Sequence, residues 1–254
     1  MKARWYVLSV MAIVLLLGLP TPARGGETTT CGGTQTVLVP DGRIVESIIP
    51  GSTTFWFEIH TSVGRSYSVE IRSKTDNTFP GTLTLFNPTD ACSGTSTLAT
   101  TLTTNADPKM SNTGRRRSFT ALGSFHRASL ANSSGTGFTY TISVSETTMF
   151  SPGWSTFGNF QTFWSFLNTT DDTINGTLTL LDATGNQVAT VGLAILSNRA
   201  AFPSTLTMGI AAGQSGTARF IHDGPPGAVL AEGAITNFAG HFQRVRFEPP
   251  REQR

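Results

Sequence analysis

The fold is decided by residues 55–71, FWFEIHTSVGRSYSVEI, in which apolar and polar side chains alternate along two successive runs. The apolar members of the two runs are Phe55, Phe57, Ile59, Tyr67, Val69 and Ile71. A period of two puts one set of side chains on a buried face and the other in water, as in a half-buried β-strand. Residues 62–65, between the runs, are typical of a turn, so the pattern predicts a β-hairpin.

The same alternation continues along the chain, and no stretch after residue 23 carries a helical stripe. A clear series covers residues 138–144, and the turn-rich residues 182–186 predict a second hairpin. Further strands are predicted at 187–196, 204–210, 217–221, 228–234 and 243–247. Strands repeating about every ten residues, with Gly, Pro and Asn between them, favour an all-β chain of two tandem β-sandwich domains, jelly-roll or immunoglobulin-like.

Pro152-Gly153 interrupts the alternation and therefore predicts a domain boundary. The expected parts are a signal peptide at 1–23, a first β-sandwich at 24–147, a linker at 148–153, a second β-sandwich at 154–248 and a tail at 249–254.

The first 23 residues have the features of a secretory signal helix that is cleaved. Lys2 and Arg4 precede an apolar run at residues 7–19, and Pro20 ends it. A bilayer-spanning helix needs about 20 apolar residues, so this run is too short to cross comfortably. We expect export to the periplasm, the cell surface or the medium, with no membrane span in the mature form. The alternative is an uncleaved signal anchor.

The charge balance gives no support for a nucleic-acid partner. The chain has 18 basic and 16 acidic residues, and removing Lys2 and Arg4 with the leader leaves equal numbers of each. Nucleic-acid binding requires a sustained basic field, which this composition lacks.

The two cysteines, Cys31 and Cys92, both lie in turn-like contexts. Export to an oxidising compartment favours a disulfide between them, which would stabilise the fold by about 4 kcal/mol in the chain-entropy model. The alternative is a pair of free thiols. No further ligand stands at metal-binding spacing from either cysteine.

Three stretches of the first module, residues 55–71, 81–100 and 133–146, resemble the bacterial pre-peptidase C-terminal domain. They match that family's aromatic strand and turn, its central hairpin and its closing strand. The resemblance implies a small jelly-roll-like sandwich of the kind appended to secreted enzymes. Some relatives bind calcium ahead of the first strand, but residues 33–50 offer only Asp41 and Glu46 here, so calcium is not expected. The second module resembles bacterial surface immunoglobulin-like sandwiches only in general terms.

No cluster of residues suggests catalysis, a metal or a cofactor. The four histidines are far apart in sequence, and no nucleophile elbow is present. His222-Asp223 precedes a Gly-Pro-Pro-Gly segment and is interpreted as a polar turn, with a catalytic pair as the alternative. Asp171, Asp172 and Asp182 are interpreted as solvated turn acids, with a Ca²⁺ site as the alternative.

The densest aromatic stretch, residues 150–166, supplies one candidate binding surface. Its proposed contact residues are Trp154, Phe157, Phe160 and Trp164. If exposed, they would form a platform for stacking on sugar rings. The favoured interpretation is that these aromatics pack the core of the second sandwich.

A second candidate is the basic run Arg115-Arg116-Arg117, which we expect in a polar loop. It would suit an acidic polysaccharide or anionic lipid. A solvated loop, or charges that prevent unwanted sheet pairing, is the favoured interpretation.

Together these patterns predict a noncatalytic exported module, not an enzyme, that binds a surface, a glycan or a protein partner. One alternative is an accessory domain pair that assists a separate secreted hydrolase. Another is a structural subunit of a surface assembly. The sequence leaves the ligand and the oligomeric state open.

Overall fold

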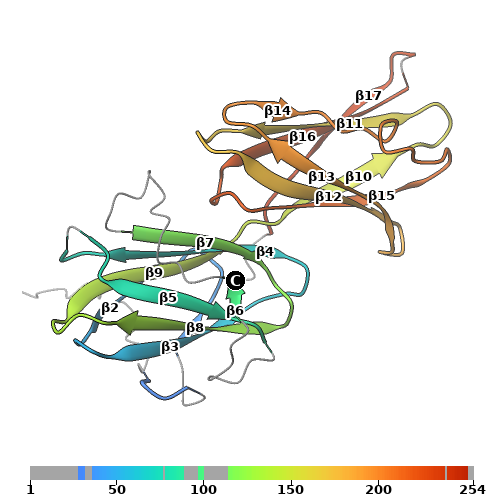
Figure 1. Ribbon diagram of the computed structural model, residues 1–254. Coiled ribbons are helices and arrows are strands. Elements are labelled where there is room, and N and C mark those ends of the chain that lie inside the picture. The colour runs from blue at the N-terminus through green and yellow to red at the C-terminus, as the bar shows by residue number, and fades with distance from the viewer. Residues whose placement is uncertain are drawn as a thin grey trace, which may run out of the picture.

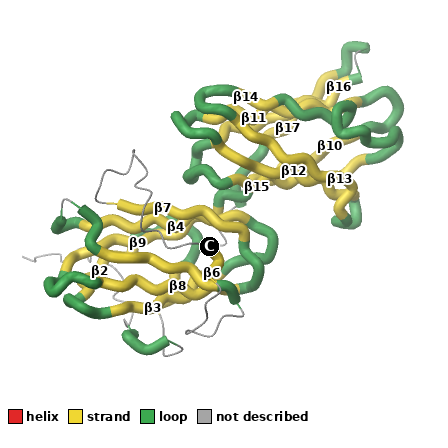
Figure 2. Tube along the Cα trace, in the orientation of Figure 1, coloured by secondary structure: helices red, strands yellow, loops and turns green. Residues whose placement is uncertain are grey.

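The computed structural model describes residues 28–31, 36–76, 78–88, 97–99, 114–237 and 239–250. All regular structure in these residues is β-strand, with no helix among them (Figures 1 and 2). The strands form four sheets around two separate cores, which confirms the all-β class and the two tandem sandwiches. The expected signal peptide lies outside the described residues.

The first sandwich packs a sheet of order β1-β3-β8-β5-β6 against a sheet of order β2-β9-β4-β7. The strands are β1 (Thr36–Leu38), β2 (Val45–Ile49), β3 (Thr54–His60), β4 (Ser66–Ser73), β5 (Gly81–Phe86), β6 (Thr97–Ala99), β7 (Gly114–Thr120), β8 (Phe125–Asn132) and β9 (Phe138–Glu146). Phe57 of one sheet meets Tyr140 of the other edge to face, with ring centroids 6.2 Å apart. Both side chains are almost fully buried, so the alternating positions supply the core.

The predicted hairpin at 55–71 is wrong, although both of its strands exist. β3 pairs with β1 and β8, whereas β4 pairs with β7 and β9 in the facing sheet. Residues 61–65 therefore cross from one sheet to the other, and Gly64 adopts a left-handed φ of 73° in that crossing. Alternation identifies which side chains face inward, but two facing sheets both direct apolar side chains inward and so give the same pattern.

The second sandwich packs a sheet of order β10-β15-β12-β13 against a sheet of order β14-β11-β16-β17. The strands are β10 (Met149–Ser155), β11 (Gln161–Asn168), β12 (Ile174–Asp182), β13 (Gln187–Ile195), β14 (Ala200–Ala201), β15 (Ser215–His222), β16 (Val229–Thr236) and β17 (Phe242–Arg246). The predicted hairpin at 182–186 is confirmed, because β12 and β13 pair on either side of it. The Asp182 carboxylate accepts hydrogen bonds from the backbone N–H groups of Thr184 (2.8 Å) and Asn186 (2.9 Å), and Gly185 has φ 88°.

Two predictions about this half need correction. Residues 204–210 form hydrogen-bonded turns instead of a strand, with Met208 N–H donating to Ser204 O and Ile210 N–H to Thr205 O. Most of the expected linker at 148–153 belongs to β10, which pairs with β15. Pro152-Gly153 lies at a β-bulge between Ser151 and Trp154, and a bulge accommodates a proline that cannot donate to the ladder.

The connection between the sandwiches is only Thr147 and Thr148, and both are buried. Thr147 N–H donates to Ser66 O at 2.8 Å, and Ser66 N–H donates to Thr148 Oγ1 at 2.8 Å. Thr147 Oγ1 also donates to Ser66 Oγ at 2.9 Å. The connection is thus hydrogen-bonded to the first residue of β4 instead of forming a free linker.

Candidate functional site

A hollow of about 660 Å³ lies where the first sandwich passes into the second. We call it the junction hollow, and six of its lining residues define it: Glu146, Met149, Leu167, His222, Leu230 and Arg246. Most of its wall belongs to β16 and the neighbouring strands of the second sandwich, and the end of β9 closes one side. The hollow is therefore a composite of both halves of the chain.

Aliphatic side chains make most of this wall. Leu167 on β11 lies directly opposite Leu230 on β16, and both point away from the core of their own sandwich. Leu230 is 59% exposed, and Val229, Met149 and Pro226 extend the apolar lining. Exposed apolar residues gathered in a concave site are typical of a binding surface.

Glu146 supplies a carboxylate to the hollow that is already paired. Arg65 Nη1 lies 3.2 Å from both carboxylate oxygens of Glu146, and its guanidinium lies over the Phe150 ring, 5.2 Å from the centroid. Burial raises the pKa of Glu146, while Arg65 and a hydrogen bond from Thr148 act in the opposite direction. The pair joins the first sandwich to β10 of the second.

His222 ends β15 and is only 5% exposed. Burial lowers its pKa to about 4, against the opposing effect of the adjacent Asp223 carboxylate. Its Nδ1 is buried with no hydrogen-bond partner, and its ring stacks on Phe220 at 5.7 Å. The ring is therefore neutral at physiological pH.

Asp223 does not form a catalytic pair with His222. Its carboxylate accepts hydrogen bonds from the backbone N–H of Asn175 (2.8 Å) and from Asn175 Nδ2 (3.0 Å). The interpretation of the dipeptide as a polar turn therefore holds for Asp223, which follows the strand, but is wrong for His222, which is the buried last residue of β15. Asp223, His222 and Asn175 also border a smaller groove of about 320 Å³ against Ser118 and Thr120 of β7.

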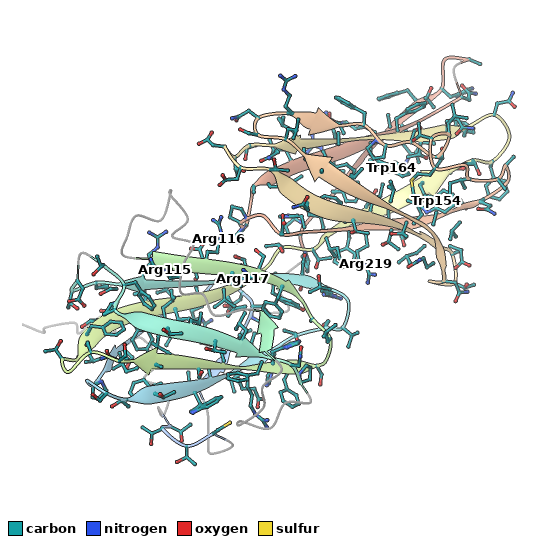
Figure 3. The ribbon with its side chains drawn as sticks, viewed as in Figure 1. Arg115, Arg116, Arg117, Trp154, Trp164 and Arg219 are labelled. Carbon is teal, nitrogen blue, oxygen red and sulfur yellow. The ribbon has the colours of Figure 1, made fainter. Side chains whose placement is uncertain are left out.

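The four aromatic residues predicted as a contact platform do not share a surface. Trp154 and Trp164 are 1% and 2% exposed and lie inside the second sandwich (Figure 3). Phe157 is exposed, and Phe160 is half-buried with its ring 6.4 Å from that of His241. The sugar-stacking platform is therefore wrong, and the core interpretation holds for the two tryptophans.

The two buried indoles differ in their hydrogen bonding. Trp154 Nε1 donates to Leu181 O at 3.0 Å and to Thr217 O at 2.9 Å. Trp164 Nε1 is buried without a hydrogen-bond partner. The Trp154 indole thus joins β12 to β15. The backbones of these two strands come very close beside it, since a Cβ added to Gly216 would lie 1.8 Å from Leu181 O.

The arginine run does not form a loop. Arg115, Arg116 and Arg117 lie along β7, the edge strand beside β4 (Figure 3). Arg116 Nη1 lies 4.0 Å from Glu70 Oε1, and Arg115 lies over the Phe79 ring at 5.7 Å. Their place on an edge agrees with the interpretation that they discourage pairing with another strand.

Two of the three acidic residues considered for calcium, Asp171 and Asp182, accept hydrogen bonds from residues in turns. The pKa of Asp182 is lowered, chiefly by a hydrogen bond from the Thr184 hydroxyl and also by the Asn186 N–H. Asp171 accepts a hydrogen bond from Asn198 Nδ2 at 3.2 Å. Within the described ranges, no group of three or more His, Cys, Asp and Glu side chains could hold a metal ion.

The cysteine pairing stays a prediction. Cys31 lies half-buried in a turn, and Cys92 lies outside the described residues. The part of the chain that the structure describes contains no free cysteine. It also contains no helix long and apolar enough to cross a membrane.

No protein-family model and no curated protein matches this chain. Among solved structures it is similar to the pre-peptidase C-terminal domain of a collagenase from Bacillus anthracis, at 12% identity and a TM-score of 0.35, over 44% of this chain and 96% of that one. It is also similar to the extracellular region of zebrafish Gpr126/Adgrg6, at 11% identity and a TM-score of 0.27, over 83% of this chain and 30% of that one. A family 2 glycosyl hydrolase from Bacteroides cellulosilyticus gives 10% identity and a TM-score of 0.23, over 80% of this chain and 27% of that one.

The first of these structures belongs to the family that the first module resembles in sequence. At such scores these likenesses support no conclusion about function. The immunoglobulin-like resemblance of the second module stays a prediction.

The junction hollow was missed in the sequence. Leu167 and Leu230 are 63 positions apart, and their pairing across β11 and β16 brings them together. One signal was available in the sequence: Leu167 and Leu230 are apolar residues at outward-facing strand positions, where alternation would place a polar side chain.

Proposed function

We propose that the chain is an exported, noncatalytic module that binds an extended, mostly apolar segment of a protein partner in the junction hollow. The observation that carries this proposal is the composition of the wall, in which Leu167, Leu230, Val229 and Met149 surround a few polar groups. Binding sites are typically concave and largely apolar, with a small number of polar groups that orient the ligand.

A protein segment suits this wall better than a glycan does. Sugar rings are bound by exposed aromatic faces together with many hydrogen-bonding groups, whereas Trp154 and Trp164 are buried. Leu167 and Leu230 offer aliphatic surface that gains by covering apolar side chains. Glu232 and Arg246, opposite each other on β16 and β17, provide charges at the rim for backbone or polar contacts.

The noncatalytic part of the proposal is supported by how the acid–base groups of the hollow are engaged. Glu146 is held by Arg65, and Glu232 is ion-paired with Arg244. His222 has a pKa of about 4 and is nearly inaccessible, so it is poorly suited to accept a proton from a substrate near neutral pH. Export is supported by the leader, and the Cys31–Cys92 disulfide belongs to the same proposal.

The test is a screen of the purified mature protein against a random-peptide display library and, in parallel, a glycan array. We expect selected peptides to be rich in apolar residues. Their dissociation constant should rise at least about tenfold in Leu230→Asp, because a charge then enters the apolar wall. The matched control is Leu122→Asp, since Leu122 in the first sandwich is 63% exposed and does not line the junction hollow.

Three results would overturn the proposal. One is a screen that selects no peptide. Another is peptide binding that Leu230→Asp leaves unchanged while the variant remains folded. The third is glycan binding that is lost in Leu230→Asp.

A further inference from the structure

The four sheets have eight edge strands, and seven of those described carry a feature that discourages pairing with another chain. β7 carries three arginines, β17 carries Arg244 and Arg246, and β2 carries Glu46. β10 contains Pro152 and a bulge. β1, β6 and β14 are only two or three residues long.

β13 is the exception. Its nine residues, QVATVGLAI, contain no charge and no proline, and its pairing with β12 is regular from Ile174↔Ile195 to Leu180↔Ala189. Its other edge is the end of its sheet. A long, uncharged and regular edge presents a row of backbone N–H and C=O groups that another strand can pair with.

A hollow of about 530 Å³ lies beside this edge. We call it the edge hollow, and Val191, Leu193, Phe202 and Met208 are among its lining residues. Val191 and Leu193 face the second core but are only partly buried, and Phe202 is 73% exposed. The second core is therefore incompletely covered on the β13 side, where an added strand would place side chains.

We propose that β13 is the interface through which two copies of this chain pair, antiparallel and about a two-fold axis at Val191. This register places Val191 opposite its own copy, Ala189 opposite Leu193, and Gln187 opposite Ile195. The β10-β15-β12-β13 sheets of the two copies then become one continuous sheet. The interface is isologous, as expected for a closed dimer.

Charge and composition favour a second copy as the occupant. The edge requires a strand without charge, and the edge hollow requires apolar side chains at every second position. β13 itself meets both conditions, with Ala189, Val191, Leu193 and Ile195 on its core side. In contrast, pairing with β7 or β17 would place the arginines of those strands beside an edge that has no counter-charge.

The same register closes both edge hollows. Residues directly opposite each other in an antiparallel pair point to the same side of the sheet. The edge hollow of each copy consequently opens on the same side of the joint sheet, next to the axis. Phe202 and the half-covered Val191 and Leu193 of both copies would then be buried together, which favours association.

The test is sedimentation velocity of the mature protein over a range of concentrations. We expect a dimer for the unmodified protein. Val191→Lys and Val191→Glu should each weaken it at least about tenfold, because two like charges then meet at the axis. Mixing the two variants should restore a dimer, since lysine then faces glutamate. Val63→Lys, at an exposed position in the first sandwich, should stay dimeric.

A second measurement avoids substitutions in β13. Hydrogen exchange of the unmodified protein should show residues 187–195 becoming more protected as the concentration rises. A protein that sediments as a monomer at every concentration overturns the proposal. So does a dimer in which Val191→Lys has no effect, or a mixture of the two charged variants that stays monomeric although both variants are folded.

Discussion

Replacing His222 with a residue that cannot titrate should reduce the stability that the second sandwich loses on acidification. His222 has a folded-state pKa of about 4, below its ordinary value of 6.5, because the ring is buried. A histidine with a lowered pKa takes up a proton in the unfolded chain before it does so in the folded one. Its contribution to stability is therefore complete above pH 6.5 and is lost as the pH falls from there toward 4.

The size of the effect follows from these two pKa values. Between near-neutral pH and pH 4, the linkage relation gives a loss of about 3 kcal/mol for this one group. Other groups also contribute over this range: Glu146 in the same hollow has a raised pKa, which acts in the opposite sense, while the pKa values of the buried His126 and of Asp182 are lowered. Comparing the wild type with His222→Phe cancels these contributions, since each is present in both proteins.

The assay is urea unfolding near pH 7.5 and near pH 4, followed by tryptophan fluorescence in a Trp56→Phe background. The signal of the mature protein then comes from Trp154 and Trp164 in the second core. On acidification, His222→Phe should gain about 3 kcal/mol relative to the wild type. His222→Gln, which also cannot titrate, should show the same gain and separates protonation from ring packing. Equal losses in all three proteins would refute the reasoning.

Three further predictions concern single contacts. Trp154→Phe should cost about 1–3 kcal/mol more than Trp164→Phe in calorimetric unfolding, because only the Trp154 indole has hydrogen bonds to lose; equal costs would contradict this. Gly216→Ala should destabilise the second sandwich by about 3 kcal/mol or more, because the new methyl group would overlap Leu181 O. In thermal melting, the control Gly192→Ala should be tolerated, because the space beside Gly192 is open. Non-reducing peptide mapping of the exported protein should recover Cys31 and Cys92 in one linked peptide, and two separately alkylated cysteines would refute the disulfide.

The strands were predictable because alternation depends on local chemistry. In β9 the core positions Phe138, Tyr140, Ile142 and Val144 are all buried, as the sequence pattern indicates. The hairpin between β12 and β13 was also predictable, because its turn is closed by the Asp182 side chain and a glycine with positive φ. Both features are decided by residues close together in the chain.

The remaining differences arise from long-range pairing. Whether β3 and β4 share a sheet depends on partners that follow much later, β8 for one and β9 for the other. The arginine run forms a strand because β4 provides a ladder for it, although its composition suggested a loop. The sequence spacing of the aromatics does not show whether Trp154 faces the core, because a β-bulge between Ser151 and Trp154 shifts the strand register just before it.

The two threonines that join the sandwiches have a consequence for proteolysis and for the angle between the halves. Cleavage requires an extended segment that can enter a protease, and Thr147 and Thr148 offer none while they remain hydrogen-bonded to Ser66. Digestion under native conditions should therefore trim the ends and outer loops without releasing two separate halves. Because Glu146 and Thr147 also form part of the wall of the junction hollow, bending the molecule at this point would reshape the hollow.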